Sequence, residues 1–196
     1  LATQKQTGQT FFRQLNTTTF ANRYGYGLYI FKKTFTELSN LNFLRYNYGI
    51  YYYNGSNNNV IIGSPICNSN GSYGIYYYSN SNNNTITGSP ICNSNGNCGI
   101  YYGSNSVNNT ITGSPICNSN GSYGIYYYNG CSNNTITGSP VCNSNGSYGI
   151  YYNNSYNNYI YGTLTTSGNT SGAIYNNKGI NYILKASIAE SAKVAG

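Results

Sequence analysis

The feature that most constrains this chain is a repeat of 25 residues through its middle. The dipeptide Gly-Ile begins at residues 49, 74, 99, 124 and 149, and Gly-Ser-Pro begins at residues 63, 88, 113 and 138. A cysteine keeps the same step at Cys67, Cys92, Cys117 and Cys142. A fixed period of this length is typical of a solenoid, in which each unit buries its apolar face against its neighbours.

Degenerate copies of the unit flank the regular ones. "YGLYI" begins at Tyr26, 22 residues before the "YGIYY" that begins at Tyr48, and "GAIYNN" begins at Gly172. Terminal units of a solenoid differ from the rest because they contact something other than a copy of themselves. We therefore predict a solenoid over residues 24–183, with about five regular coils and a degenerate coil at each end. Residues 1–23 and 184–196 are predicted to be tails that cap it or serve in assembly.

Each unit contains only short elements with the period of a β-strand. "GIYYY" and "NNTITG" alternate β-branched or aromatic residues with others, and Asn, Gly, Ser and Pro clusters bound them. No stretch of the repeat has a helical period over the roughly 10–12 residues that a helix needs. Short strands at constant spacing predict a coil of about three strands, each stacked about 4.8 Å from its equivalent. The predicted fold is all-β, a parallel β-helix.

Strand alternation assigns the faces of each coil. The isoleucines of Gly-Ile, the second tyrosine after each, and the isoleucine of "TIT" are predicted to point inward. A third inward column is predicted at Ile66, Ile91, Ile116 and Val141, with an inward asparagine ladder at Asn68, Asn93, Asn118 and Asn143. An outward tyrosine stripe is predicted at Tyr51, Tyr76, Tyr101, Tyr126 and Tyr151.

The stretch "NNTITGSPICNSNGSYGIYYY" from Asn108 to Tyr128 resembles a known family of repeats. It is similar to the right-handed parallel β-helix repeats of pectate-lyase-like proteins. The subgroup it resembles is Asn-rich, is named after a periplasmic copper-binding accessory protein and is common in archaeal surface proteins. The resemblance covers about residues 24–183 and implies a right-handed parallel β-helix. It also implies polysaccharide chemistry at clustered acidic residues, a Ca²⁺ site or a basic residue.

The chain departs from that implied chemistry. It has two acidic residues, Glu37 and Glu190, which lie in opposite end segments, and it has no histidine. Glycoside hydrolysis needs two carboxylates within about 10 Å. Copper or zinc would have only the six cysteines as soft ligands, without His or Met and without a C-x-x-C motif. We expect no catalysis, no cofactor and no metal site.

The cysteines leave two interpretations open. Covalent links within or between subunits are one, and free thiols that serve as small packing groups are the other, because spacing does not fix connectivity. Each cysteine of the regular column follows a core isoleucine, which predicts that the column faces outward or lies at the turn. Cys92–Cys98 is the preferred pair, since six residues and a turn separate them. The disulfide candidates are Cys67, Cys92, Cys98, Cys117, Cys131 and Cys142.

Asn-x-Ser/Thr sequons recur at the turn before Gly-Ile and before the "TI" strand. In a secreted chain such surface turns are candidate N-glycosylation sites. They are Asn16, Asn54, Asn70, Asn83, Asn108, Asn120, Asn133, Asn145, Asn153 and Asn169.

The charge distribution favours a structural role for the ends. The formal net charge is +7, but no charged residue lies between Tyr46 and Asn177. The thinly spread Lys and Arg do not predict nucleic-acid binding, and no apolar run is long enough for a transmembrane helix.

Our first hypothesis is a secreted, non-catalytic structural protein. It would be the N-glycosylated subunit of an extracellular or cell-surface filament, which assembles with copies of itself through the solenoid ends and terminal segments.

The alternative is a carbohydrate-binding adhesin or surface-layer module. Its glycan-stacking surface would be the outward tyrosine stripe, since aromatic faces pack on sugars.

Overall fold

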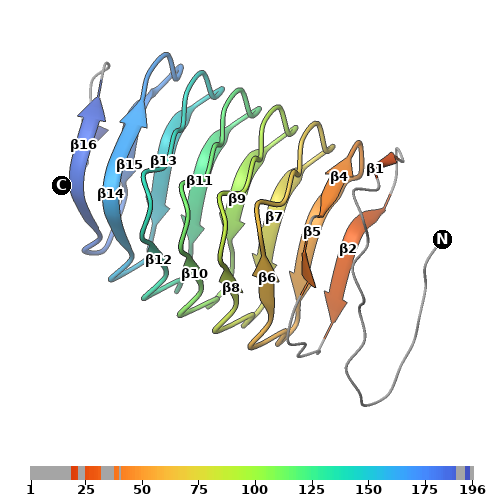
Figure 1. Ribbon diagram of the computed structural model, residues 1–196. Coiled ribbons are helices and arrows are strands. Elements are labelled where there is room, and N and C mark those ends of the chain that lie inside the picture. Colours follow the sequence, from red (N-terminus) through yellow and green to blue (C-terminus); the bar gives the residue numbers. More distant parts are fainter. Residues whose placement is uncertain (1–18, 22–24, 32–37, 40, 189–192, 195–196) are drawn as a thin grey trace.

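The computed structural model describes residues 19–21, 25–31, 38–39, 41–188 and 193–194. Successive turns of the chain stack along one axis, from β2 (Tyr26–Phe31) at one end to β16 (Tyr182–Ile188) at the other (Figure 1). All the strand pairs between coils are parallel, and the described residues contain no helix. The prediction of an all-β parallel β-helix is therefore confirmed.

Two long sheets form two sides of the solenoid. The first, which we call the tyrosine sheet, contains β2 (Tyr26–Phe31), β5 (Tyr48–Tyr53), β7 (Tyr73–Tyr78), β9 (Cys98–Tyr102), β11 (Tyr123–Tyr128), β13 (Tyr148–Asn153), β15 (Gly172–Asn176) and β17 (Lys193–Val194). The second, which we call the threonine sheet, contains β3 (Leu38–Ser39), β6 (Val60–Ile62), β8 (Thr85–Ile86), β10 (Thr110–Ile111), β12 (Thr135–Ile136), β14 (Tyr159–Thr166) and β16 (Tyr182–Ile188).

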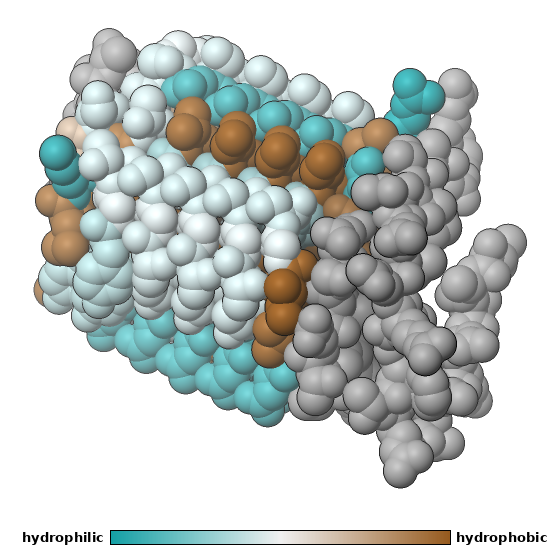
Figure 2. All heavy atoms as spheres, in the orientation of Figure 1, coloured by the Kyte–Doolittle hydropathy of each residue, from teal (hydrophilic) through white to brown (hydrophobic). Residues whose placement is uncertain are grey.

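The third side of the solenoid is held by single bridges. Ile66, Ile91, Ile116 and Val141 pair one after another along the axis. At the N-terminal end of this side β1 (Thr19–Ala21) pairs with β4 (Asn42–Leu44). Because every coil pairs in register with the next, identical residues form columns along the axis. Figure 2 shows these columns as regular rows of polar and apolar residues.

The isoleucine and tyrosine columns predicted to point inward do form the core. Ile50, Tyr52 and Ile61 have no exposed surface, and the equivalent residues of the following coils are buried in the same way. The pairing Ile50↔Ile75 and Tyr52↔Tyr77 keeps these side chains in contact from coil to coil. The alternation of side chains in "GIYYY" and "TIT" therefore predicted correctly which residues face inward.

The third predicted core column was wrong by one residue. Ile66 and its equivalents are only half-buried, whereas Cys67, Cys92, Cys117 and Cys142 have no exposed surface. The cysteines therefore face inward, not outward as predicted. The reason is space, because a Cβ atom on Gly49 would lie 2.8 Å from the Cβ of Cys67. The glycine column has no side chain at this point, which lets the inward cysteines pack directly against its backbone.

The predicted inward asparagine ladder was wrong by two residues. Asn68 and its equivalents are half-buried, and their Oδ1 atoms accept from the backbone N–H of the next coil, as from Asn93 at 2.7 Å. Ser69 has φ 55°. This left-handed residue turns the chain, so that Asn70 points inward instead.

Two buried ladders result. In each, one asparagine donates its backbone N–H and its Nδ2–H to the Oδ1 of the next, as Asn95 does to Asn120 at 3.0 and 3.1 Å. One ladder runs through Asn70, Asn95, Asn120, Asn145 and Asn169, and the other through Asn59, Asn84, Asn109, Asn134, Asn158 and Asn181.

Candidate functional site

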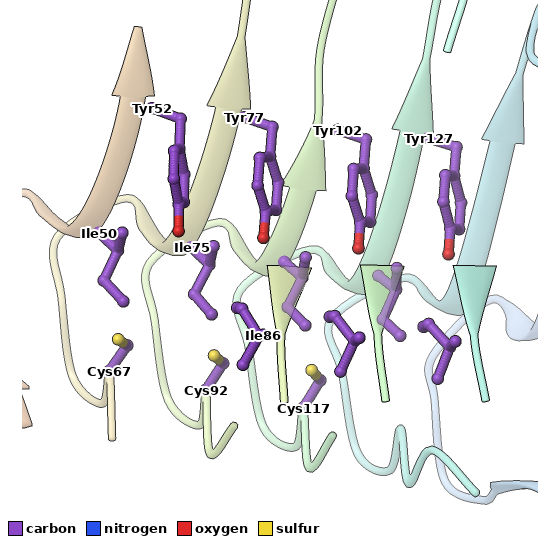
Figure 3. Packing of buried hydrophobic residues seen from close by; sticks show 14 of the residues in the cluster. Ile50, Tyr52, Cys67, Ile75, Tyr77, Ile86, Cys92, Tyr102, Cys117 and Tyr127 are labelled. Atoms are coloured by element: carbon purple, nitrogen blue, oxygen red, sulfur yellow. The ribbon is translucent and has the colours of Figure 1, made fainter. Parts of the chain in front are cut away.

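The four cysteines at the repeat spacing form one column of buried thiols. Figure 3 shows Cys67, Cys92 and Cys117 side by side on successive coils, pointing into the core beside the isoleucines. The column continues through Cys142, and Phe43 and Thr166 hold the equivalent positions at its two ends. All six cysteines of the chain are free and buried.

The prediction of disulfides is therefore corrected, including the preferred Cys92–Cys98 pair. Cys92 belongs to the inward column, whereas Cys98 pairs in register with Tyr73 and Tyr123 on the outward side of the tyrosine sheet. The sheet backbone separates the two sulfurs. Cys131 takes the buried corner position that Ser56, Ser81 and Ser106 hold in other coils. It does not belong to the column either.

The core environment raises the pKa of five of the thiols, those of Cys92, Cys98, Cys117, Cys131 and Cys142. Burial raises the pKa of Cys92 and Cys117 well above the ordinary value of a thiol. The pKa of Cys142 is raised by its interaction with Cys117 and then by burial, and burial raises that of Cys131 to about 12. Since the thiolate is the nucleophile, these groups are poor nucleophiles near neutral pH.

A column of buried phenols lies next to the thiols. Tyr52, Tyr77, Tyr102, Tyr127 and Tyr152 stack with ring centroids 4.6 to 4.9 Å apart, and the hydroxyls of Tyr102, Tyr127 and Tyr152 have no hydrogen-bond partner. Burial raises the pKa of Tyr102 and Tyr127, so these phenols are neutral. The column supplies stacking and apolar surface, with no base near it to accept a proton.

The outward tyrosine stripe is packed by its own neighbours. Tyr51 is only 8% exposed, and Tyr76, Tyr101, Tyr126 and Tyr151 are half-buried. The ring of Tyr51 stacks on Tyr48 and Tyr76 with centroids 4.9 Å apart in both cases. The ring faces thus meet other rings along the axis. This geometry favours coil-to-coil stabilisation over a platform for sugars.

The structure separates the candidate glycosylation sites into two groups. Asn70, Asn120, Asn145 and Asn169 are buried in a ladder, and their Nδ2 atoms donate hydrogen bonds inside it. At these four positions the nitrogen that would carry the glycan is hydrogen-bonded and buried in the folded structure, which disfavours them as acceptors. Asn83, Asn108 and Asn133 are exposed, Asn54 and Asn153 are half-buried, and Asn16 lies outside the described residues.

The two ends of the solenoid hold all the strongly exposed large hydrophobic side chains of the described residues. At the N-terminal end these are Tyr26, Tyr29, Phe31 and Ile62, and at the C-terminal end Tyr156, Tyr161, Ile180, Tyr182 and Leu184. The highest values belong to Ile180 at 66% and Leu184 at 65% exposed. No such side chain lies in the coils between residues 63 and 155. The most exposed large apolar side chains therefore lie near the ends, while the half-buried column Ile66, Ile91, Ile116 and Val141 runs along the middle coils.

A model of one protein family matches residues 4–188 of the chain. The family is described as the periplasmic copper-binding protein NosD. The chain belongs to the NosD family. Neither a curated protein nor a solved structure gives a significant match. The family description points to the cell envelope, and the described residues include no helix long and apolar enough to cross a membrane.

The residues of this NosD family member do not fit a copper centre. Copper sites combine imidazole, thioether and thiolate ligands, and the chain has neither His nor Met. Across the part of the chain that the structure describes, no three His, Cys, Asp or Glu side chains gather as ligands would. The two glutamates, Glu37 and Glu190, lie outside the described residues. No step of the function proposed below runs through copper.

Proposed function

We propose that this NosD family member is a non-catalytic structural protein, the subunit of an extracellular or cell-surface filament that assembles end to end. The concentration of exposed large apolar side chains in the two coils at each end of the solenoid carries the proposal. Large apolar patches on a soluble protein mark interaction sites. Here two of them lie at opposite ends of one axis, so contact between unlike ends repeats without closing.

The sheet edges support the same arrangement. β2 is the last strand of the tyrosine sheet at the N-terminal end, and β16 is the last strand of the threonine sheet at the C-terminal end. Edge strands present unpaired backbone groups that a strand of another copy can pair with. Every strand in the stack is already parallel, so a second copy in the same orientation extends the pattern that the coils follow internally.

The inert chemistry of the coils supports a structural rather than a catalytic role. Between Tyr46 and Asn177 the chain has no charged residue, and burial raises the pKa of groups such as Cys92 and Tyr102 well above their ordinary values. General acid–base catalysis needs groups whose pKa lies near the working pH. The repeat instead forms a long stack of coils whose strands pair in register.

Charge substitution at the C-terminal end tests the proposal. Ile180→Asp and Leu184→Asp place carboxylates on side chains that are 66% and 65% exposed, so the fold of the subunit should tolerate them. We expect the double variant to sediment as a monomer where the natural chain forms larger species. Thr112→Asp, on the exposed middle of the threonine sheet, is the matched control and should still assemble. Equal assembly of both variants would show that the C-terminal end is not the interface.

We propose further that N-glycans, where present, attach to the column Asn83, Asn108 and Asn133. These asparagines are exposed and lie in left-handed turns with φ between 55° and 57°. Glycosylation of the folded protein by an oligosaccharyltransferase, followed by peptide mass spectrometry, should find glycans there. A glycan on Asn120 or Asn145 of correctly folded protein would contradict this assignment.

A further inference from the structure

The buried thiol column has a geometry that neither the packing of the core nor the proposed filament requires. Cys67, Cys92, Cys117 and Cys142 occupy the same position in four successive coils, without exposed surface. The adjacent bridges Ile66↔Ile91, Ile91↔Ile116 and Ile116↔Val141 keep these coils in register. Equivalent atoms in neighbouring coils are therefore about 4.8 Å apart.

This spacing suits a metal ion that binds two thiolates in a line. A metal–thiolate bond of about 2.3 Å, the length found with zinc, places the two sulfurs of a linear S–metal–S unit about 4.6 Å apart. A tetrahedral site needs four ligands that converge on one point. A column offers only two neighbours to any point on its axis. The geometry thus selects soft ions that accept two ligands.

The charge of the surroundings selects a divalent ion. The column lies among Ile50, Ile75 and the ladder asparagines, and the coils from residue 48 to residue 177 contain no charged side chain. A divalent ion with two thiolates is neutral. A monovalent ion such as Cu(I) would leave one buried negative charge without a partner, which costs several kcal/mol.

We propose that adjacent thiols of the column bind a soft, two-coordinate divalent metal ion, with Hg(II) as the representative species. The full column has room for two such ions, one between Cys67 and Cys92 and one between Cys117 and Cys142. In each site two S–H bonds break, two S–metal bonds form and two protons pass to solvent, with no change of oxidation state.

The closed ends of the column determine how the ion enters. Phe43 and Thr166 occupy the positions beyond the first and last cysteine and are themselves buried. The ion therefore enters while the coils are open, during folding or through local unfolding. An experiment on the full chain should accordingly add the metal during refolding.

The test compares two variants that keep two column thiols each and differ only in their spacing. Both carry Cys98→Ala and Cys131→Ser, which remove the two thiols outside the column. The adjacent variant adds Cys67→Ala and Cys92→Ala, leaving Cys117 and Cys142 on neighbouring coils. The separated variant adds Cys67→Ala and Cys117→Ala, leaving Cys92 and Cys142 two coils apart. Each is refolded from urea with mercuric chloride and then dialysed.

We expect the adjacent variant to retain one Hg(II) per chain and the separated variant none. X-ray absorption should show two sulfur neighbours at about 2.3 Å. The melting temperature of the adjacent variant should rise on loading, because the folded column holds its two thiols at the spacing that the ion needs and so binds it more tightly than the unfolded chain does. Circular dichroism without metal shows whether both variants fold. Equal retention by the two variants, three sulfur neighbours, or a lower melting temperature on loading would overturn the proposal.

Discussion

Replacing one asparagine of a buried ladder should destabilise the solenoid more than replacing an outward one. Asn109 lies in the middle of its ladder, with no exposed surface. Its Oδ1 accepts from the backbone N–H and the Nδ2–H of Asn84, both at 3.0 Å. Its Nδ2 donates to the carbonyl of Ser81 at 2.9 Å and to Oδ1 of Asn134 at 3.0 Å.

The size of the effect follows from the groups that lose a partner. In Asn109→Ala, the backbone N–H of Asn84 and the carbonyl of Ser81 lose these bonds, and the Nδ2 of Asn84 keeps only its bond to Ser56. The Oδ1 of Asn134 still accepts from the backbone N–H of residue 109. A buried polar group without a partner costs about 1–3 kcal/mol, so the variant should lose about 3–5 kcal/mol.

The control is Asn118→Ala in the same coil. Asn118 is half-buried, and its Oδ1 accepts a single bond, from the backbone N–H of Asn143 at 2.8 Å. Water can replace that bond, so the expected loss is about 1 kcal/mol or less. Urea unfolding followed by far-ultraviolet circular dichroism measures both, with the m-value checked for constancy. If Asn109→Ala costs no more than Asn118→Ala, the buried ladder does not stabilise the fold as argued.

Three further predictions concern the core and its ionisation. Tyr102→Phe should stabilise the protein by about 1 kcal/mol in urea unfolding, because it removes a buried hydroxyl that has no partner; a clear loss of stability would mean that the hydroxyl is satisfied. Gly99→Ala should lower the free energy of unfolding by about 1–3 kcal/mol, since its Cβ would lie 2.8 Å from the carbonyl oxygen of Gly124. Gly55→Ala, with φ 76° and open space around it, should lower it by only about 1 kcal/mol. Burial raises the pKa of Cys98 and raises that of Cys131 to about 12. Stability should therefore be constant below about pH 8.5, the pKa of an unfolded thiol, and fall as the pH rises toward the folded values; a variant with Cys98→Ala and Cys131→Ser should show a shallower fall.

The sequence predicted the parts of the fold that depend on long-range periodicity. The 25-residue step fixes which residues pair between coils, and the observed pairs Ile75↔Ile100 and Tyr77↔Tyr102 follow from it. Within "GIYYY" the alternation of side chains also predicts which residues point inward. These two rules are sufficient for the tyrosine and threonine sheets.

The prediction of the asparagine ladder failed because single residues in the left-handed conformation interrupt the alternation of side chains. Ser69 with φ 55° and Asn58 with φ 58° each precede a ladder asparagine. Neither a serine nor an asparagine is sufficient by itself to predict that conformation from the sequence. The phase of the short third side therefore could not be obtained by counting. One signal was available, because the glycine at the start of each "GIYYY" allows an inward side chain to pack directly against its backbone, and the cysteines recur at the same 25-residue spacing.

The candidate site residues could also be recognised from local sequence motifs, but their accessibility depends on the fold. Sequons are recognised from three residues, but whether Asn70 or Asn83 is accessible depends on the turn that precedes each of them. The open cysteine alternatives were resolved by burial, which places the column inside the solenoid with free thiols.

Electron microscopy of the full chain, purified without denaturant, tests the central claim most directly. End-to-end assembly predicts fibres of uniform width whose axial repeat is close to the length of one solenoid, because unlike ends meet along a single axis. Dispersed single particles of one solenoid length, at concentrations where sedimentation also shows only monomer, would contradict end-to-end assembly.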